Sequence, residues 1–353
     1  MKIAIINDTH CGARNSSEVF INYQRRFYEE IFFPYLLKND IKHIVHLGDY
    51  YEHRKFINFK ALNANRKMFL DPLRTHGIHL EIIAGNHDVY YKNTNDLCAI
   101  KELMGFYTDC VTVHMKPTEL TFGSTKIGLV PWINNENYGD TIRFLKNTKA
   151  NIIGGHFELE GFEMMKGVKS PHGMSIEPLK KFDLVLSGHF HTKSQQGDIH
   201  YLGSQYEFTW SDCDDPKYFH ILDTETGEIE PIRNPITIFD KIIYNDQKMV
   251  YNDYDFKQHE DKFVKVIVTQ KKDLYAFDKF IDGLHSINTH DLKIAEAFDE
   301  YLGENVEDSG VSIESTETLL DSYIGSVQTD LEVDKLRSIM RDLYKEAQVM
   351  EVL

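Results

Sequence analysis

Residues 78–89 read Ile-His-Leu-Glu-Ile-Ile-Ala-Gly-Asn-His-Asp-Val, an apolar run of strand length that stops abruptly at Gly85-Asn86-His87-Asp88. An apolar run that ends in turn residues predicts a buried strand. Four such residues in a row would be an odd strand terminus unless they carry chemistry. The first half of the chain repeats the pattern four more times: residues 3–6 run into Asn7-Asp8-Thr9-His10, 41–47 into Gly48-Asp49, 152–153 into Gly154-Gly155-His156, and 184–186 into Ser187-Gly188-His189-Phe190-His191.

Helix-period segments separate the early strands. Apolar residues recur at helical spacing over residues 20–36, and more weakly over 59–69, where Pro72 lies near the expected end. Strands that alternate with helices predict an α/β layered domain. In such sheets ligands collect beyond the carboxyl ends of the strands, which is where all five polar clusters lie.

The pattern changes after about residue 200, and from there on we expect smaller units. Asn234-Pro235 is a turn signal that marks the expected end of the core, residues 1–235. Alternating strands and a helix predict a small α+β capping domain over 236–298. Residues 299–317 contain seven acidic residues and no Lys or Arg, as a solvated linker does, and amphipathic segments in 318–353 predict a helical hairpin. The expected strands are 201–203, 218–223, 229–232, 238–244 and 263–269, and the expected helix of the capping domain is 275–285.

The chain of 353 residues carries 55 acidic and 39 basic residues, which gives a formal charge of −16. This excludes a protein whose whole surface attracts nucleic acid, so any contact with DNA or RNA needs local basic patches, bound metals or a partner. The four cysteines form no Cys-x-x-Cys pair, which is against a zinc ribbon or a disulfide framework. No apolar stretch approaches the ~18 residues of a membrane span, and the N-terminal run is too short for a signal peptide. We therefore expect a soluble, cytoplasmic protein with no membrane partner.

Eight side chains at the expected strand ends combine carboxylate, carboxamide and imidazole groups. These are the ligand types of first-row metals such as Mn²⁺, Fe²⁺ or Zn²⁺, whereas an all-oxygen Mg²⁺ or Ca²⁺ site would not need several imidazoles. One carboxylate can bridge two metals held ~3.5–4 Å apart, and Asp49, alone at its strand end, is the candidate bridge. The eight are Asp8, His10, Asp49, Asn86, His87, His156, His189 and His191.

The charges of this set predict a site for phosphate. Two divalent metals bring +4, and Asp8 with Asp49 return −2, which leaves about +2 to attract a phosphate and stabilise its oxygens. A metal also lowers the pKa of a bound water, which can then attack phosphorus in line. His87 lies beside a ligand but is spare in the ligand count, so it is the natural group to contact the phosphate and protonate the leaving oxygen. Asp88 either orients that imidazole or is a plain turn residue.

The five motifs resemble those of calcineurin-like metallophosphoesterases. The matching strings are Asp8-x-His10, Gly48-Asp49, Gly85-Asn86-His87-Asp88, Gly155-His156 and Gly188-His189-x-His191. The resemblance covers roughly the first 190 residues and implies a two-sheet αββα sandwich around a two-metal centre. It also implies how the ligands divide: Asp8, His10, Asp49 and His191 around one metal, and Asp49, Asn86, His156 and His189 around the other.

The order of core, small capping domain, linker and terminal helices is similar to that of the SbcD (Mre-eleven) DNA-repair nucleases. Strings at 155–162, 187–192 and 201–204 look like the T-even-type phage members, which are nuclease subunits of a recombination endonuclease. This resemblance implies a Mn²⁺-dependent exonuclease on duplex ends and endonuclease on single strands, with Mg²⁺, Fe²⁺ or Zn²⁺ as alternative metals. It implies a role in DNA recombination, repair and recombination-dependent replication, in the host cytoplasm if the chain is phage-encoded. It also implies a homodimer that binds an SbcC (Rad-fifty) type ATPase through the terminal helices.

One neighbourhood departs from the family pattern. Cellular members often carry a second catalytic histidine shortly after the motif-two Asp, where this chain reads Tyr50-Tyr51-Glu52-His53-Arg54. We therefore assign no second catalytic histidine at His53.

A basic stretch follows the second motif directly. Residues 53–67 contain five Lys or Arg and no acidic residue, so we hypothesise that they contact the phosphate backbone of DNA close to the metals. The alternative is a solvated helix face or a dimer contact. The five are Arg54, Lys55, Lys60, Arg66 and Lys67, and a weaker group of Lys262, Lys265, Lys271 and Lys272 lies in the small domain.

Two rival functions stay open. A phosphatase or small-molecule phosphodiesterase of the same superfamily would use the same centre. Protein phosphatases of that kind resemble Gly-Asn-His-Glu and Asp-Arg-Gly patterns, which this chain lacks, and they would not need a terminal hairpin. The other rival is a DNA-tethering scaffold whose catalysis is secondary, and the complete ligand set argues against a dead site.

Overall fold

The computed structural model describes residues 1–165, 167–296, 335–336 and 339–340. The chain divides into two compact units, Met1–Ala295 and Glu296–Leu353, and the elements below belong to the first or end at its border. The linker predicted over 299–317 and the helical segment predicted over 318–353 lie outside the described residues, apart from 335–336 and 339–340.

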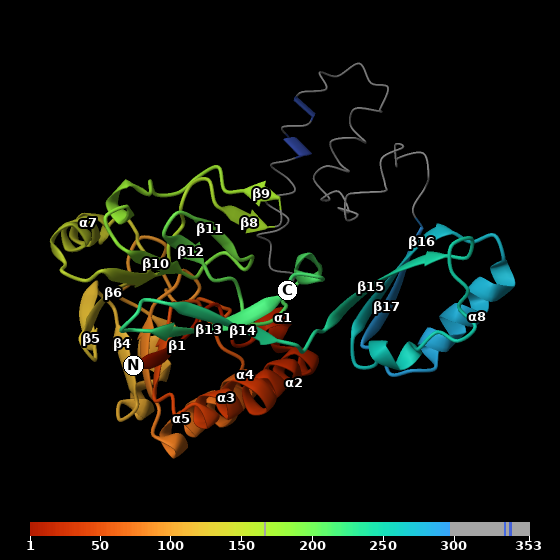
Figure 1. The fold of residues 1–353 in the computed structure, drawn as a ribbon, viewed down its shortest axis with the longest axis horizontal. Coiled ribbons are helices and arrows are strands. Elements are labelled where there is room, and N and C mark those ends of the chain that lie inside the picture. The colour runs from red at the N-terminus through yellow and green to blue at the C-terminus, as the bar shows by residue number, and fades with distance from the viewer. Residues whose placement is uncertain (166, 297–334, 337–338, 341–353) are drawn as a thin grey trace. The chain divides into compact units, whose positions relative to one another are not determined.

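Within the described residues, two six-stranded sheets form the centre of the first unit (Figure 1). The first sheet consists, in spatial order, of β14 Ile229–Asn234, β13 Lys217–Asp223, β1 Lys2–Ile6, β2 His43–His46, β3 His79–Ile83 and β4 Val111–His114. β1 to β4 run parallel to one another, and β13 pairs antiparallel with β1. The parallel strands therefore deliver their carboxyl ends to one edge.

The second sheet repeats this arrangement. It consists, in spatial order, of β11 Ser194–Gln196, β12 Ile199–Tyr201, β10 Leu184–Ser187, β7 Ile152–Gly155, β6 Thr125–Val130 and β5 Thr118–Phe122. β12, β10, β7 and β6 run parallel, with antiparallel strands at both edges. The strand expected at 201–203 ends at Tyr201, whereas those expected at 218–223 and 229–232 lie within β13 and β14.

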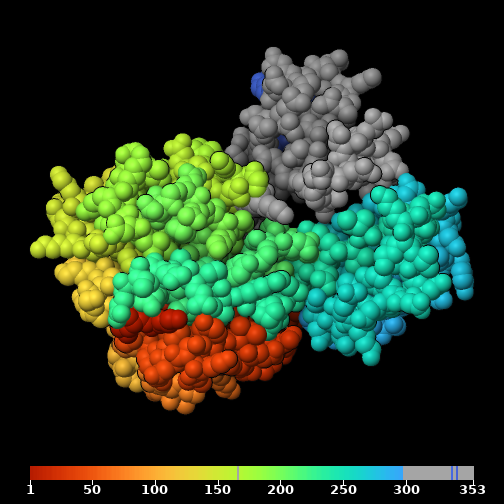
Figure 2. Space-filling view, viewed as in Figure 1, coloured from red at the N-terminus to blue at the C-terminus, as the bar shows by residue number. Residues whose placement is uncertain are grey.

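Both faces of each sheet are buried, which makes four layers. Ile5 and Val45 of the first sheet meet Leu129 and Leu186 of the second in one apolar core. The outer face of the first sheet packs against the helices at 18–38 and 59–76, which form the red to orange surface in Figure 2. The outer face of the second sheet packs against α7 Tyr138–Asn147. Strands buried on both faces are mostly apolar, and the predicted αββα sandwich is confirmed.

Two long helices each contain a π-helical turn just before a proline. The first is made of α2 Glu18–Arg26, η1 Phe27–Phe32 and α3 Phe33–Lys38, and the second of α4 Phe59–Asn65, η2 Arg66–Leu70 and α5 Asp71–His76. Pro34 and Pro72 follow the two π turns. Proline donates no N–H and its ring clashes with the carbonyl four residues earlier, so the preceding turn widens. The second helix therefore passes Pro72, near its expected end, and stops at left-handed Gly77.

Shorter elements connect these layers. They are α1 Ala13–Ser16, α6 Ala99–Leu103, η3 Gly105–Tyr107, η4 Glu177–Leu179, η5 Trp210–Asp212 and the hairpin of β8 Glu163–Met165 with β9 Val168–Lys169. All four cysteines are buried free thiols, as the absence of paired spacing predicted. In the part of the chain that the structure describes, no helix combines the length and apolar character needed to cross a membrane.

A small three-stranded sheet lies within residues 236–298. It contains β15 Phe239–Asn245, β16 Phe263–Gln270 and β17 Asp291–Glu296, together with η6 Phe256–His259 and α8 Leu274–His285. Val266 of the sheet and Phe280 of α8 share one apolar core. Two strands and the helix were predicted, and β17 was not. The division of the chain at residue 235 stays a prediction, since one compact unit includes both sides of it.

Glu207 holds the residues at the start of this small sheet by hydrogen bonds. Its carboxylate Oε2 accepts the backbone N–H groups of Ile238 at 2.7 Å and Phe239 at 3.0 Å. The Tyr23 hydroxyl donates to the carbonyl of Ile236 at 3.0 Å. A buried acid thus satisfies two backbone donors at the first residues of β15.

Candidate metal centre

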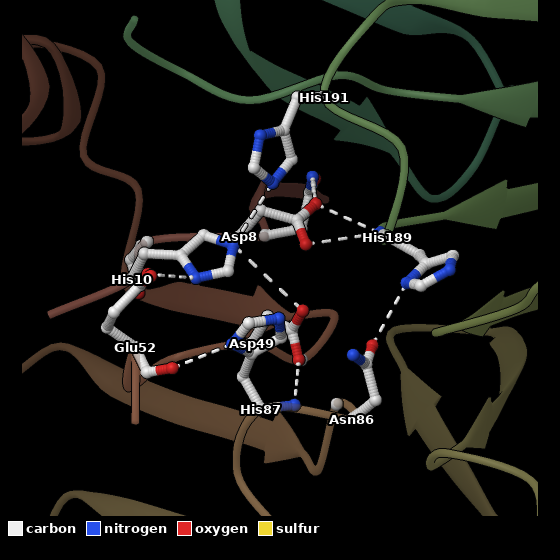
Figure 3. A network of polar contacts seen from close by, with 12 residues as sticks. Asp8, His10, Asp49, Glu52, Asn86, His87, His189 and His191 are labelled. Carbon is white, nitrogen blue, oxygen red and sulfur yellow. Dashed lines mark hydrogen bonds and ion pairs between the residues drawn. The ribbon is translucent and has the colours of Figure 1, made fainter. Parts of the chain in front are cut away.

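The polar clusters that follow five strands meet between the carboxyl ends of the two sheets (Figure 3). Parallel strands end at the same edge, so β1, β2 and β3 bring their clusters together, and β7 with β10 does the same in the other sheet. All seven predicted ligands and His87 gather here. The first sheet contributes Asp8, His10, Asp49, Asn86 and His87, and the second contributes His156, His189 and His191.

One half of the centre consists of Asp8, His10 and His191, whose ligand atoms lie within 4.8 Å of one another. The Nε2 atoms of the two imidazoles are 3.0 Å apart. Asp8 is held in place by the Asn7 side-chain amide, which donates to its Oδ2 at 2.5 Å. Two converging ring nitrogens and a carboxylate fit a first-row divalent metal.

The other half consists of Asp49, His156 and His189, again with ligand atoms within 4.8 Å. Asn86 Oδ1 lies 3.0 Å from His156 Nε2 and 3.0 Å from His189 Nδ1. The carboxamide oxygen, the carboxylate and the two ring nitrogens therefore converge, and this donor set also fits a divalent metal.

Asp49 faces both halves. Its Oδ2 lies 3.9 Å from His10 Nε2 and 3.3 Å from His156 Nε2. Its Oδ1 accepts the backbone N–H of His87 at 2.8 Å. One carboxylate placed between imidazoles of both halves has the position that a bridging ligand needs.

Backbone carbonyls orient two of the histidines. His156 Nδ1 donates to the carbonyl of Leu47 at 2.7 Å, and His87 Nδ1 donates to the carbonyl of Glu52 at 2.7 Å. A proton held on Nδ1 leaves the lone pair of Nε2 directed away from the carbonyl. For His156 that nitrogen is the one that faces Asp49. His87 lies within 4.8 Å of ligand atoms of His10 and Asp49, so it borders the centre directly.

The electrostatics of the centre favour an added cation. Burial lowers the pKa of His10, but Glu52 and Asp49 outweigh burial and raise that pKa to about 9. Burial is likewise outweighed at His156, where Asp49 raises the pKa to about 9. Burial and the charge on His156 lower the pKa of His189 to about 3. Protons on two imidazoles thus compensate the carboxylates, and a bound metal would displace them.

Four of the seven predicted ligands have left-handed backbone. The φ angles are 49° at Asp8, 43° at His10, 56° at Asp49 and 90° at His189. This region is uncommon for residues other than glycine, and such strain costs about 1–3 kcal/mol per residue. It persists where the surrounding structure holds it, and it clusters at active sites and ligand clamps.

Of the two alternatives for Asp88, the contacts of its side chain do not support orientation of the His87 ring. The Asp88 carboxylate is fully buried and accepts backbone N–H groups of Tyr50, Tyr51 and Gly85 at 2.9–3.2 Å. It is committed to these donors because they would otherwise be buried without an acceptor. The ring of His87 is held by the Glu52 carbonyl instead. Asp88 therefore fixes the loops around the centre, which is more than a plain turn residue does.

The five basic residues of the stretch at 53–67 differ in their exposure and in whether their charge has a partner. Lys60 Nζ lies 2.8 Å from the carboxylate of Glu18, so its charge has a partner. Arg66 is half-buried, with its guanidinium 6.0 Å from the centre of the Phe106 ring. Arg54 is half-buried, whereas Lys55 and Lys67 are exposed. DNA binding by these residues stays a prediction.

Sequence reasoning missed residues that contact the ligands or the loops that carry them. Lys217 Nζ donates to the carbonyl of His191 at 3.0 Å and pairs with Asp212 at 2.7 Å. His46, assigned no role from the sequence, accepts the N–H of Gly48 at 3.2 Å and bonds the Thr9 hydroxyl at 3.0 Å. None of these lies in a recognisable motif, and only their contacts in space show their role.

Comparisons with known proteins agree with the geometry. Residues 1–193 match the model of the calcineurin-like phosphoesterase family. A protein of Enterobacteria phage T4 named exonuclease subunit 1 is 33% identical over 350 residues, which is 98% of this chain and 99% of that protein. Among solved structures, an archaeal phosphodiesterase aligns with 14% identity and a TM-score of 0.35 over 66% of this chain and 100% of its own. A protein of unknown function from Aquifex aeolicus aligns with 19% identity and a TM-score of 0.25 over 56% of this chain and 82% of its own.

Proposed function

The chain belongs to the calcineurin-like phosphoesterase family, and from this premise we propose that it is a two-metal nuclease that hydrolyses DNA phosphodiesters. The single observation that carries the proposal is the position of Asp49, whose Oδ2 faces His10 Nε2 and His156 Nε2 from opposite halves of one centre. A centre of this kind suits phosphoryl transfer, because its excess positive charge is complementary to phosphate oxygens.

We propose that Asp8, His10, Asp49 and His191 would hold one metal, and that Asp49, Asn86, His156 and His189 would hold the other. This division is supported by the close approach of the ligand atoms within each half and by the position of Asp49 between them. When bound, the metals supply charge stabilisation and lower the pKa of a coordinated water. We propose Mn²⁺ as the physiological ion, because the mixed nitrogen and oxygen donors suit it.

The choice of DNA as substrate is supported by the phage relative. That protein is named as an exonuclease subunit, and the two chains match over nearly their full lengths. We propose exonuclease action on duplex ends and endonuclease action on single strands, in recombination, repair and recombination-dependent replication. The name of the relative also supports an assembly, which we propose is a homodimer bound to an SbcC (Rad-fifty) type ATPase.

His87 is the proposed general acid. Its Nδ1 is tied to the Glu52 carbonyl, so Nε2 is the nitrogen left to contact the phosphate and to protonate the leaving oxygen. We expect His87→Gln to keep both metals and DNA binding but to lose about 10²–10⁴-fold in cleavage rate. His76→Gln, at the far end of α5, is the matched control. Full activity in the His87 variant would remove this residue from the mechanism, and loss of a metal would make it a ligand.

The substrate class is tested with metal-stripped protein. Mn²⁺, Mg²⁺, Fe²⁺ or Zn²⁺ is added back, and cleavage is followed on end-labelled duplexes, single-stranded circles, a chromogenic phosphodiester and a chromogenic phosphomonoester. We expect Mn²⁺-dependent cleavage of both DNAs. Hydrolysis of the monoester alone would indicate a phosphatase, and DNA binding without any cleavage would indicate a tethering scaffold.

The partner interface is tested by truncation. Deleting residues 315–353 should abolish association with the ATPase and leave Mn²⁺-dependent cleavage of single strands. A complex that persists after the deletion would place the interface elsewhere.

A further inference from the structure

Glu52 touches two functional histidines at once. Its Oε2 lies 2.8 Å from His10 Nδ1, and its backbone carbonyl accepts His87 Nδ1 at 2.7 Å. The residue is anchored in turn, because its N–H donates to the carbonyl of Cys11 at 3.1 Å. Figure 3 shows it beside the half of the centre that contains His10.

The contact with His10 has a chemical consequence. His10 Nδ1 is buried, and no acceptor lies along the direction in which its N–H would point. The Glu52 carboxylate is the group beside it, 2.8 Å away but off that direction. The opposite nitrogen, Nε2, points at His191 Nε2 at 3.0 Å. A carboxylate beside Nδ1 holds the ring proton there and leaves Nε2 as the donor atom, which also becomes more basic.

We propose that Glu52 is a positioning residue for both histidines, through its side chain for the ligand His10 and through its carbonyl for His87. The proposal rests on the two-metal function above. Glu52 is not assigned as a ligand, since its oxygen faces the nitrogen of His10 that is turned away from the other ligands. Its two contacts are separable by mutation, because a side-chain substitution leaves the carbonyl in place.

The test measures metal binding with Mn²⁺ as the only probe. Calorimetric titration of metal-stripped, full-length protein counts the sites and their affinities. In Glu52→Ala we expect one of the two Mn²⁺ sites to weaken 10–100-fold while the other is unchanged. In Glu52→Gln we expect most of the affinity to return, since the isosteric side chain can still place an amide oxygen beside the proton on His10 Nδ1. Low-temperature Mn²⁺ EPR at two equivalents should show a coupled pair in wild type and more isolated Mn²⁺ in Glu52→Ala.

The control is Glu18→Gln, which removes an acid of equal charge that is exposed and pairs with Lys60. Thermal unfolding of the metal-free variants checks that each is folded, and the isosteric glutamine variant keeps the test valid if the alanine variant is not. Unchanged binding in Glu52→Ala would overturn the proposal, as would equal losses in Glu52→Ala and Glu52→Gln, which would indicate direct ligation. A wild-type protein that binds fewer than two Mn²⁺ would instead contradict the proposed function.

Discussion

Gly85→Ala is the substitution whose effect on the centre is easiest to work out from the structure. A Cβ added at Gly85 would lie 2.1 Å from Asp49 Oδ1 and 2.2 Å from the Asp49 backbone nitrogen. Real Cβ atoms stay beyond 3.0 Å, so the carboxylate and its loop must retreat by about 0.9 Å. Rotation of the Asp49 side chain cannot relieve this clash, because the backbone nitrogen of Asp49 is nearly as close as its carboxylate. The two loops also approach each other at Gly48, where an added Cβ would lie 2.8 Å from Gly85 Cα.

The retreat should affect catalysis more than folding. A misplacement of about 1 Å costs on the order of 100-fold in rate where reacting groups must be aligned. Asp49 serves both halves, so we expect both Mn²⁺ affinities to fall, unlike the single-site loss expected for Glu52→Ala. The displaced carboxylate would also lose the N–H of His87, now 2.8 Å from its Oδ1.

The assay combines Mn²⁺ titration with cleavage of end-labelled duplex DNA. Gly139→Ala is the matched control, because a Cβ there meets nothing within 4 Å. Gly139 lies in helix α7, where alanine should be neutral or stabilise by about 0.5–1 kcal/mol. If the Gly85→Ala enzyme had two tight Mn²⁺ sites and an activity within about threefold of wild type, the reasoning would be refuted. The centre would then not require the loops of Gly85 and Asp49 to lie this close.

Three further predictions concern stability. Burial raises the pKa of Glu207 from 4.5 to about 7, so this residue's contribution is fully present below pH 4.5 and is lost as pH rises through 7, by about 3 kcal/mol. Glu207→Gln should flatten this pH dependence and raise the free energy of unfolding at pH 8, since an amide oxygen can accept both N–H groups. Urea unfolding at pH 5.5 and 8 gives the change in unfolding free energy between the two pH values, and an equal change in both proteins would contradict the prediction. Asp88→Asn turns an amide toward a buried N–H, so it should lower the unfolding free energy by about 1–3 kcal/mol, and unchanged urea unfolding would count against that. Chelating the metals should lower the thermal midpoint, because each site contributes about 4 kcal/mol at a thousandfold excess over Kd; calorimetry showing no shift would argue against tight binding.

The strands that precede the five motifs, and the chemistry at their ends, could be predicted from the sequence because they are local. A strand buried on both faces is rich in apolar residues, as 78–83 are apart from His79 and Glu81, and the change to Gly85-Asn86-His87-Asp88 is visible without a fold. The ends of the helices were harder to predict from the sequence. Pro72 predicts an end to its helix, yet the chain instead widened one turn and continued to His76, because packing of Met68 and Phe69 in the core outweighs the lost hydrogen bond.

The sequence by itself determined which residues meet at the candidate centre: the seven candidate ligands and His87 stand at strand ends that parallel strands bring together. Only the tertiary structure decided what each side chain contacts. Asp88 turned to three backbone donors rather than to its neighbour His87, and Glu52 reached His10 through space. The physical reason is that hydrogen bonds depend on the direction of groups to within tens of degrees, which spacing along a chain does not specify. Spacing places a residue at an edge of a sheet, and the packed loops determine where its side chain points.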